Sequence, residues 1–300
     1  MKSNYEVIIV GGSYAGLSAA LALGRSLREV LIVDSSLPCN RQTPHSHNFI
    51  TQDGVPPAEI AAIAKEQVLQ YKSVDYITDL AVTSKKSQGG FEVKTESDKI
   101  FWAKKVIFAT GLKDEIPPIS GFAECWGISL IHCPYCHGYE FRNNKTGIIA
   151  NCDRAFHLAS LVGNLTSQLY ILTNGRADFT SEQLKKLDQN HINIIESEIS
   201  QVKHHNGHLQ KVVFKNQEMM GFDALYAGFP FSQHSGLPEA LGCELTQHGH
   251  IKVDEFQKTT VEGIYACGDN SNMMRSVANS VASGNLAGAM VNAELTKEQF

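Results

Sequence analysis

The 300-residue sequence has no excess of basic side chains, and this absence limits the partners that it can bind. Lysine and arginine total 26 against 31 aspartates and glutamates, so the formal net charge is −5. A chain of this charge lacks the basic surface that binding to nucleic acid requires. It also lacks an apolar run long enough to span a bilayer. We therefore expect neither a nucleic acid nor a membrane as partner.

Cysteines paired at regular spacing, typical of small secreted domains, are also missing. The seven cysteines are an odd number in a long chain, which does not indicate a disulfide framework. The apolar run from Val7 to Gly24 follows Glu6 directly and is interrupted by glycines, so it differs from a signal peptide. We interpret it as a strand, a loop and a helix, and we expect a cytoplasmic protein.

No low-complexity linker divides the chain. Three hundred residues suffice for about two domains, and a content of 43% hydrophobic and 19% charged residues is ordinary for a globular enzyme. Without a linker, the sequence favours two domains joined by short segments, one inserted into the other.

The first fifty residues contain a strand–helix–strand pattern. Glu6–Val10 is a short β-branched run, Leu17–Leu27 carries apolar residues at helical spacing, and Val30–Asp34 is a second strand. Between the first strand and the helix lies the glycine-rich loop Gly11–Gly16. This order predicts the βαβ unit of a dinucleotide-binding domain.

The loop residues suit phosphate binding. Gly11 permits a tight turn, Gly16 allows close helix–strand packing, and the N-terminus of the following helix presents N–H groups to a pyrophosphate. We predict Gly11, Ser13, Ala15 and Gly16 as cofactor-binding residues. Ser13 stands at the middle glycine position of G-x-G-x-x-G, where it is small and can donate a hydrogen bond. Asp34 lies at the distance expected for a carboxylate that binds a ribose 2′-hydroxyl.

Two later segments favour FAD over NAD in this loop. The buried-strand run Val106–Gly111 ends in Ala-Thr-Gly, and Gly263–Asp269 is another strand that ends in Gly-Asp. We expect Asp269 at the start of a helix that runs to about Leu295, where its carboxylate accepts from ribitol hydroxyls and the helix dipole stabilises reduced flavin. The cofactor-binding residues predicted from these segments are Ala109, Thr110, Gly111, Gly268 and Asp269.

The sequence Cys133-Pro134-Tyr135-Cys136-His137-Gly138 is a candidate redox pair. Two thiols separated by two residues can close and reopen a disulfide at little loop-closure cost. If the pair begins a helix, the N–H groups and the dipole favour the thiolate. The imidazole of His137 exchanges protons near neutral pH, so we predict it as the acid/base, with His132 as a second candidate.

Two other interpretations of this cluster are weaker. A structural zinc site with Cys125 and His132 would need a second close pair of ligands, and none follows, so no metal is predicted. A glutaredoxin-like module, which shares Cys-Pro-Tyr-Cys, would need its own strand–helix unit around the pair. The flanking segments fit a flavoprotein instead.

The chain contains, in this order, the segments GGSYAG, Asp34, ATG, CPYCHGYE and GHIKVDEFQKTTVEGIYACGD. Together they resemble the low-molecular-weight thioredoxin reductase family along nearly the whole chain. The segment CPYCHGYE is most similar to the gliotoxin- and holomycin-type dithiol oxidase branch and its bacterial relatives. The resemblance implies the α/β architecture of pyridine nucleotide-disulfide oxidoreductases, with two Rossmann-like domains, the second inserted into the first. The FAD domain would comprise residues 1–112 and 245–300, and residues 113–244 would form an NAD(P)H-binding-like domain with the CxxC.

The resemblance also assigns roles to single residues. Cys136 would face the flavin, and Cys133 would exchange with the substrate. Arg41, in the segment 40–54, would contact the FAD phosphates. Family members are usually homodimers, so we expect a homodimer here.

The second phosphate loop has lost its glycines. Thr146–Ala150, Asp153–Asn164 and Gln168–Leu172 repeat the βαβ pattern, but residues 150–155 read ANCDRA where the family has G-x-G-x-x-A. The carboxylate of Asp153 opposes a diphosphate by roughly 1 kcal/mol or more. A single Arg176 beside Asp178 replaces the basic cluster that holds the NADPH 2′-phosphate. We expect the fold to persist without ordinary NADPH use.

The sequence therefore predicts a flavoenzyme that exchanges electrons between FAD and a dithiol or disulfide. Its substrate is a small dithiol or disulfide, or a thioredoxin-like protein. One alternative is an NAD(P)H-dependent thioredoxin (disulfide) reductase with an atypical nucleotide loop. An alternative of another class is a flavin-bearing redox sensor, in which the thiols switch conformation instead of turning over.

Overall fold

The structure of the chain is a computed structural model that describes residues 2–300. The residue contacts divide it into two compact units. The first unit contains residues up to Arg41, Val55–Lys113 and Phe231–Phe300, and the second contains Gln42–Gly54 and Asp114–Pro230. The chain thus returns to the first unit at Phe231, ahead of the residue 245 expected from the sequence, and the segment 42–54 groups with the second unit.

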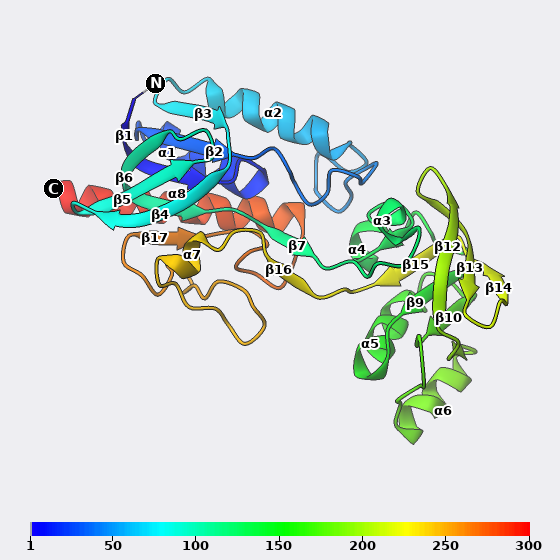
Figure 1. Cartoon of the computed structure of the whole chain (residues 1–300). Coiled ribbons are helices and arrows are strands. Elements are labelled where there is room, and N and C mark those ends of the chain that lie inside the picture. Colours follow the sequence, from blue (N-terminus) through cyan, green and yellow to red (C-terminus); the bar gives the residue numbers. More distant parts are fainter. Residues whose placement is uncertain (1) are drawn as a thin grey trace. The chain divides into compact units, whose positions relative to one another are not determined.

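The first unit is a sheet with helices packed on it (Figure 1). Its elements are β1 (Asn4–Val10), α1 (Tyr14–Arg25), β2 (Val30–Asp34), α2 (Pro57–Leu69), β3 (Val74–Thr78), β4 (Ala81–Ser87), β5 (Gly90–Thr95), β6 (Ile100–Phe108), β7 (Leu112–Asp114), β16 (Phe231–Gln233), α7 (Leu237–Ala240), β17 (Ile264–Ala266) and α8 (Val277–Gln299). The sheet order is β3-β2-β1-β6-β5-β4, and β17 pairs with β6. The strands β3, β2, β1, β6 and β17 are parallel, whereas β4 and β5 are antiparallel additions.

Both faces of this sheet are buried because its strands are apolar on both sides. In β1, Val7 and Ile9 pack into one cluster with α1 and α8, while Ile8 and Val10 pack into a second cluster on the other face. This continuous apolar run is typical of parallel strands covered on both faces. The predicted first βαβ unit is therefore confirmed, with the helix beginning at Tyr14.

The helices α1 and α8 approach closely where α8 carries glycine. A Cβ atom on Gly284 would lie 2.1 Å from the carbonyl oxygen of Ala15, and one on Gly288 would lie 2.5 Å from that of Ala19. Neither separation is possible for real atoms, so these positions require glycine. The contact fixes the start of α1, which carries the glycine-rich loop, against the C-terminal helix.

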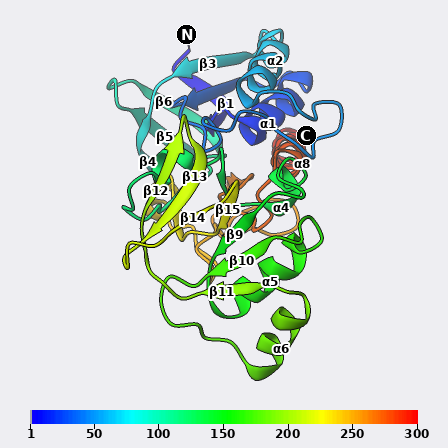
Figure 2. The same cartoon turned by 90° about the vertical axis from the view of Figure 1, so that its right-hand side faces the viewer.

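The second unit is also built around a parallel sheet (Figure 2). Its elements are α3 (Phe122–Cys125), β8 (Leu130–Ile131), α4 (Pro134–His137), β9 (Thr146–Ile149), α5 (Cys152–Val162), β10 (Leu169–Leu172), α6 (Ser181–Gln189), β11 (Asn193–Ile195), β12 (Ile199–His205), β13 (His208–Phe214), β14 (Met219–Gly221) and β15 (Ala224–Ala227). The five parallel strands follow the order β11-β10-β9-β15-β8, and β12, β13 and β14 form a separate antiparallel sheet.

The βαβ pattern expected around residues 146–172 is confirmed as β9, α5 and β10. A hairpin turns at Asn206, where β12 and β13 pair with His205 opposite His208. Both units are Rossmann-like, so the predicted α/β fold is correct.

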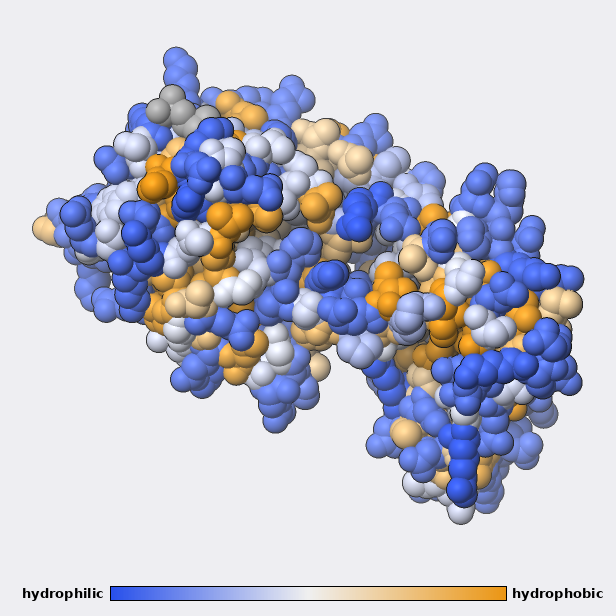
Figure 3. Space-filling view, in the orientation of Figure 1, coloured by the Kyte–Doolittle hydropathy of each residue, from blue (hydrophilic) through white to orange (hydrophobic). Residues whose placement is uncertain are grey.

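The visible surface is mainly hydrophilic, with apolar side chains in scattered patches (Figure 3). Across residues 2–300, no helix is apolar enough over a sufficient length to cross a bilayer. The longest of them, α8 with 23 residues, carries Glu294, Lys297 and Glu298 in its last turns.

Candidate functional site

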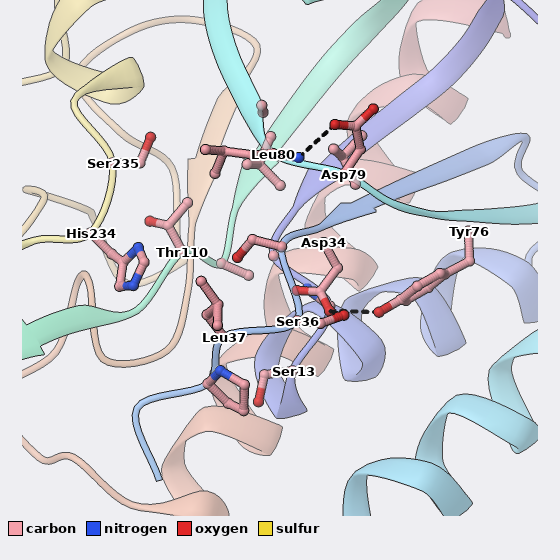
Figure 4. Close-up of a pocket in the computed structure, with 18 of the residues that line it drawn as sticks. Ser13, Asp34, Ser36, Leu37, Tyr76, Asp79, Leu80, Thr110, His234 and Ser235 are labelled. Carbon is pink, nitrogen blue, oxygen red and sulfur yellow. Dashed lines mark hydrogen bonds between the residues drawn. The ribbon is translucent and has the colours of Figure 1, made fainter. Parts of the chain in front are cut away.

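A pocket of about 640 Å³ lies in the first unit at the carboxyl ends of β1, β2 and β6. This is the edge where ligands bind in open α/β sheets, and the volume suits a large cofactor. Of the predicted cofactor residues, the pocket brings together Gly11, Ser13, Asp34, Ala109 and Thr110 (Figure 4).

The glycine-rich loop is packed so tightly that larger residues do not fit. Gly11 has a φ of +106°, and a Cβ atom there would lie 2.2 Å from the carbonyl oxygen of Ala109. A Cβ on Gly16 would lie 1.8 Å from the carbonyl oxygen of Gly11. Ser13 is the N-cap of α1, and its side chain makes no capping hydrogen bond. Ser13 thus leaves the N–H groups of the first turn of α1 without a side-chain cap. A pyrophosphate site requires this, because these N–H groups bind the phosphate oxygens.

Asp34 ends β2 with its carboxylate held from two sides. The backbone N–H of Gly12 donates to Oδ1 at 2.9 Å, and the hydroxyl of Tyr76 donates to Oδ2 at 2.6 Å. Figure 4 shows the Tyr76 hydrogen bond at the pocket wall. The predicted ribose-binding carboxylate is therefore oriented by the protein itself.

The predicted segment Gly268–Asp269 lies near the glycine-rich loop. A Cβ on Gly268 would lie 2.9 Å from the Cβ of Ala15, which places the segment beside the start of α1. We expected Asp269 at a helix start, and this was wrong, because α8 begins at Val277 after a Ser276 N-cap. Asp269 instead accepts a hydrogen bond from Ser280, in the first turn of α8, at 3.3 Å.

The side chain of the neighbouring Asn270 indicates that this region fits a cofactor. Its side chain is fully buried and its amide donates to Phe108 and Thr110, but its Oδ1 has no hydrogen-bond partner within residues 2–300. A buried acceptor without a partner is costly, so it indicates a ligand or water at this point. Together with the cradle around Gly11, the residues present fit FAD.

Six predicted cofactor-binding residues do not line the pocket, namely Ala15, Gly16, Arg41, Gly111, Gly268 and Asp269. Gly111 has a positive φ of +65° with open space around it, and Gly268 lies beside α1 as described. Arg41 is exposed, and its guanidinium donates to the carbonyl of Pro38 at 3.2 Å.

In the second unit, the thiols of Cys133 and Cys136 lie together. Their Sγ atoms are 2.8 Å apart. Cys133 is the N-cap of α4, and Cys136 lies within this helix. Because α4 is a single turn of four residues, its dipole is small, so the predicted stabilisation of the thiolate by a helix is limited.

His137 follows the pair in an environment that disfavours its charge. Burial is the main cause of a pKa lowered to about 4, and the charges of His47 and His132 act in the same direction while Glu140 opposes them. The imidazole is therefore neutral near pH 7. The expectation that His137 changes protonation near neutral pH does not agree with this environment, although a neutral ring can still accept a proton transiently.

His47 reaches this site from the segment Gln42–Gly54. Its Nδ1 lies 3.6 Å from Glu140 Oε1 and 3.7 Å from Asp53 Oδ1. The segment is anchored on the second unit by Gln42, whose amide donates to the carbonyl of Ala123 at 3.1 Å. Sequence reasoning assigned this segment to the flavin, so it missed His47 as a charged neighbour of Glu140 and His137.

The nucleotide crevice of the second unit is bridged by the chain's own side chains. Asn151 caps α5 by accepting from the backbone N–H of Cys152 at 2.9 Å. It also accepts from the N–H of Asp178 at 3.0 Å and donates to the carbonyl of Arg176 at 2.8 Å. The side chain of Gln183 adds a hydrogen bond to Asp153 at 2.7 Å. The loops after β9 and β10 are thus joined directly.

Arg154 covers the next part of the same edge. A Cβ on Gly228, just after β15, would lie 1.8 Å from a guanidinium nitrogen of Arg154, so the side chain lies against the Gly228 backbone. The strands β9 and β15 are neighbours on either side of the point where the strand order reverses. Ligands of doubly wound sheets bind at this point. Arg154 is exposed, and its side chain nevertheless makes this contact.

Comparisons with known proteins agree with this arrangement. Residues 5–284 match the family model described as pyridine nucleotide-disulphide oxidoreductase. The thioredoxin reductase tcpT of Claviceps purpurea is 31% identical over 97% of this chain and 94% of its own. The crystal structure of an oxidoreductase from Agrobacterium tumefaciens is 35% identical, covers 98% of this chain and 99% of its own, and has a TM-score of 0.91. The crystal structure of HlmI is 27% identical, covers 100% of this chain and 95% of its own, and has a TM-score of 0.93.

A glycine-rich dinucleotide pocket and a Cys-x-x-Cys pair on two Rossmann-like units define a disulfide oxidoreductase, and the chain is an enzyme of this kind. It belongs to the pyridine nucleotide-disulphide oxidoreductase family, whose members in general bind FAD. Within that family it is thioredoxin reductase-like, as its resemblance predicted.

Several residues of both sites were not found from the sequence. In the pocket they are Lys65, Tyr76, Asp79, His234 and Ser235, which come from α2, from β3 and the short connection after it, and from the segment after β16. In the second unit, Tyr226 of β15 lies with its hydroxyl 3.1 Å from the position of a Cβ on Gly138. None belongs to a local sequence pattern, because each is brought in by tertiary contacts.

Proposed function

We propose that the chain is an FAD-dependent thiol–disulfide oxidoreductase. It exchanges electrons between the flavin and a dithiol or disulfide substrate through Cys133 and Cys136, without ordinary use of NADPH. The observation that carries the proposal is the 2.8 Å separation of the two Sγ atoms, which allows them to form and break a disulfide. When bound in the pocket of the first unit, FAD supplies two-electron redox chemistry.

The thiol chemistry balances in the direction of dithiol oxidation. One substrate thiolate attacks Cys133 Sγ of the enzyme disulfide, so the Cys133–Cys136 bond breaks and its electron pair stays on Cys136 Sγ. The second substrate thiolate then attacks the substrate sulfur of the mixed disulfide and releases Cys133 as a thiolate. The substrate leaves as a disulfide, having lost two electrons, and the enzyme pair is reduced. A small dithiol or a thioredoxin-like protein would suit this exchange.

The joined loops of the second unit support the absence of ordinary NADPH use. In a nucleotide site the first loop leaves space for the pyrophosphate, and glycine provides that space. Here Asn151 fills it and bonds to the loop after β10, and Asp153 adds a negative charge. Arg154 lies against Gly228 at the adjacent strand ends. A nicotinamide nucleotide would have to break these contacts in order to bind.

A second candidate is an NAD(P)H-dependent disulfide reductase with an atypical loop. It is favoured by the relatives, several of which carry the name thioredoxin reductase. In that case the Asn151 contacts would open when the nucleotide binds. The two candidates differ in the source of the electrons.

Anaerobic reduction of the purified yellow protein distinguishes them. We expect dithiothreitol to bleach the flavin and air to restore its colour, while NADPH and NADH leave the spectrum unchanged over the same period. Rapid bleaching by either nucleotide would establish the reductase. Failure of repeated dithiol additions to sustain oxygen uptake, after a single reduction of the thiols, would indicate a sensor instead of an enzyme. The Cys133→Ser variant is the control in which flavin remains but dithiol bleaching is lost.

A further inference from the structure

Tyr76 lies beside the carboxylate that the first unit presents to its pocket. The residue belongs to β3, which is parallel to β2, and its side chain lines the pocket with Asp34 (Figure 4). Its hydroxyl donates to Asp34 Oδ2 at 2.6 Å, while the N–H of Gly12 takes Oδ1 at 2.9 Å. The hydroxyl of Ser36 also donates to Oδ2, at 3.4 Å. A carboxylate oxygen has about two lone pairs, so Oδ1 is the atom that can accept one further hydrogen bond. Its remaining lone pair therefore has a fixed direction.

The phenol is itself held in place. The ammonium of Lys65, on α2, lies 3.5 Å from the centroid of the Tyr76 ring, which is a close cation–π contact. Burial raises the pKa of Tyr76 above its ordinary value, and the hydrogen bond and charge of Asp34 raise it further. The phenol thus remains protonated and a donor throughout the pH range of a folded protein.

We propose that Tyr76 is a positioning residue of this pocket: its hydroxyl fixes the Asp34 carboxylate for recognition of the adenosine 2′-hydroxyl of FAD. The proposal rests on the proposed binding of FAD. A site built to bind a hydroxyl discriminates strongly against a ligand that lacks it, because its buried polar groups are then left unpaired. A free carboxylate would rotate toward water and lose part of this discrimination. The negative charge of Asp34 also disfavours a 2′-phosphate.

The same chain provides a matched control. Tyr5, on β1, donates to Asp75 Oδ2 at 2.8 Å, so it forms a second tyrosine–aspartate pair in the same sheet. Neither Tyr5 nor Asp75 lines the pocket. If Tyr76 served only to join β2 and β3, removing either hydroxyl would change stability and leave nucleotide affinity unaltered.

The experiment compares Tyr76→Phe with Tyr5→Phe in the full chain. Each apoprotein is titrated with FAD and with an FAD analogue that lacks the adenosine 2′-hydroxyl, and binding is followed by quenching of flavin fluorescence. We expect Tyr76→Phe to weaken FAD binding roughly tenfold and to reduce the preference for FAD over the analogue. We expect Tyr5→Phe to keep both affinities within about twofold, since its hydrogen bond lies outside the pocket.

An unchanged ratio between FAD and the analogue in Tyr76→Phe would overturn the proposal. The variant Lys65→Met, which keeps the hydroxyl but removes the ammonium, provides a second measurement if Tyr76→Phe does not fold. Its FAD affinity is expected to fall about two- to fivefold, as a cation–π contact predicts, and no loss would count against the proposal. A wild-type protein that binds no FAD would instead contradict the proposed function, so the two failures are distinguishable.

Discussion

Asn151 and Asp178 are joined by a hydrogen bond of 3.0 Å from the Asp178 backbone N–H to the Asn151 side-chain oxygen. This bond crosses the carboxyl ends of β9 and β10, where a Rossmann-type unit receives the ribose and phosphates of its nucleotide. The asparagine stands in the loop that, by the family resemblance, corresponds to G-x-G-x-x-A. The fold of a nucleotide domain is therefore preserved while its crevice is bridged from within.

The first prediction concerns the stability that Asn151 provides. Asn151→Ala removes the N-cap of α5 and both bonds to the loop after β10, so we expect the second unit to lose about 1–2 kcal/mol of unfolding free energy. Urea unfolding followed by circular dichroism measures the loss. Asn216→Ala is the control, because its hydrogen bonds to Glu218 and Ser197 lie on the exposed surface and cap no helix. An equal loss in both variants would contradict a special role for Asn151.

The second prediction concerns the thiol pair. Cys133→Ser removes the sulfur that exchanges with the substrate, so dithiol-dependent oxygen uptake should fall roughly 100-fold or more while FAD stays bound. Cys136→Ser should also abolish uptake and change the flavin absorbance, since the resemblance places this thiol nearest the flavin. Cys152→Ser is the matched control, an exposed cysteine outside the pair. Full activity in Cys133→Ser would exclude the thiol mechanism.

The third prediction concerns pH and His137. The pKa of His137 in the folded chain is about 4, below its ordinary value of 6.5. Between pH 4 and pH 6.5, the imidazole therefore binds a proton in the unfolded chain and stays neutral in the folded chain. Stability is therefore complete above pH 6.5 and falls as the pH drops toward 4. His137→Gln should remove this part of the slope, by at most about 3 kcal/mol.

Urea unfolding of wild type and His137→Gln at pH 7.5 and pH 4.5 measures the difference. His205→Gln, on the exposed hairpin, is the control and should keep the wild-type slope. Parallel pH dependence in all three proteins would show that His137 is solvated and charged in the folded state.

The fourth prediction concerns Glu294, which ties α8 to the sheet. Burial opposes its ionisation, but hydrogen bonds from Lys105, Lys258 and Tyr265 outweigh this effect and lower its pKa to about 2. Glu294→Gln leaves the buried ammonium of Lys105 with less compensation, so we expect a loss of about 2–4 kcal/mol in urea unfolding at pH 7.

The exposed pair of Lys215 and Glu198 provides the comparison for Glu294. Glu198→Gln should cost no more than about 0.5 kcal/mol, because surface ion pairs are weak. Because the pKa of Glu294 is depressed, its contribution should persist above pH 5 and disappear as the pH falls toward 2.

The sequence predicted those parts of the structure that depend on local pattern. The βαβ unit around Gly11–Gly16 follows from continuously apolar strands and a glycine turn, and both were confirmed. The family was confirmed as well. The start of α8 was placed wrongly at Asp269, because an acidic residue before an apolar stretch suggested a helix start. In the structure the polar loop after Asp269 continues to Ser276, whose side chain caps the helix.

The contents of the sites were harder to predict because distant segments supply them. Tyr76 reaches Asp34 only because β3 pairs with β2, and His47 reaches Glu140 through a loop anchored far along the chain. The effect of burial on His137 also depends on packing, which a sequence pattern does not give. The sequence therefore identified the thiol pair as a candidate site, but it did not predict the electrostatic surroundings of that pair.

The segment Gln42–Gly54 lies in the sequence between two elements of the first unit, yet its contacts belong to the second. Exchanging residues 114–230 as a cassette between relatives would leave His47 and Gln42 facing a foreign partner. The second unit is thus encoded by two separate stretches of the chain. A chimaera would need to carry both pieces together to keep the surroundings of Cys133 and Cys136 intact.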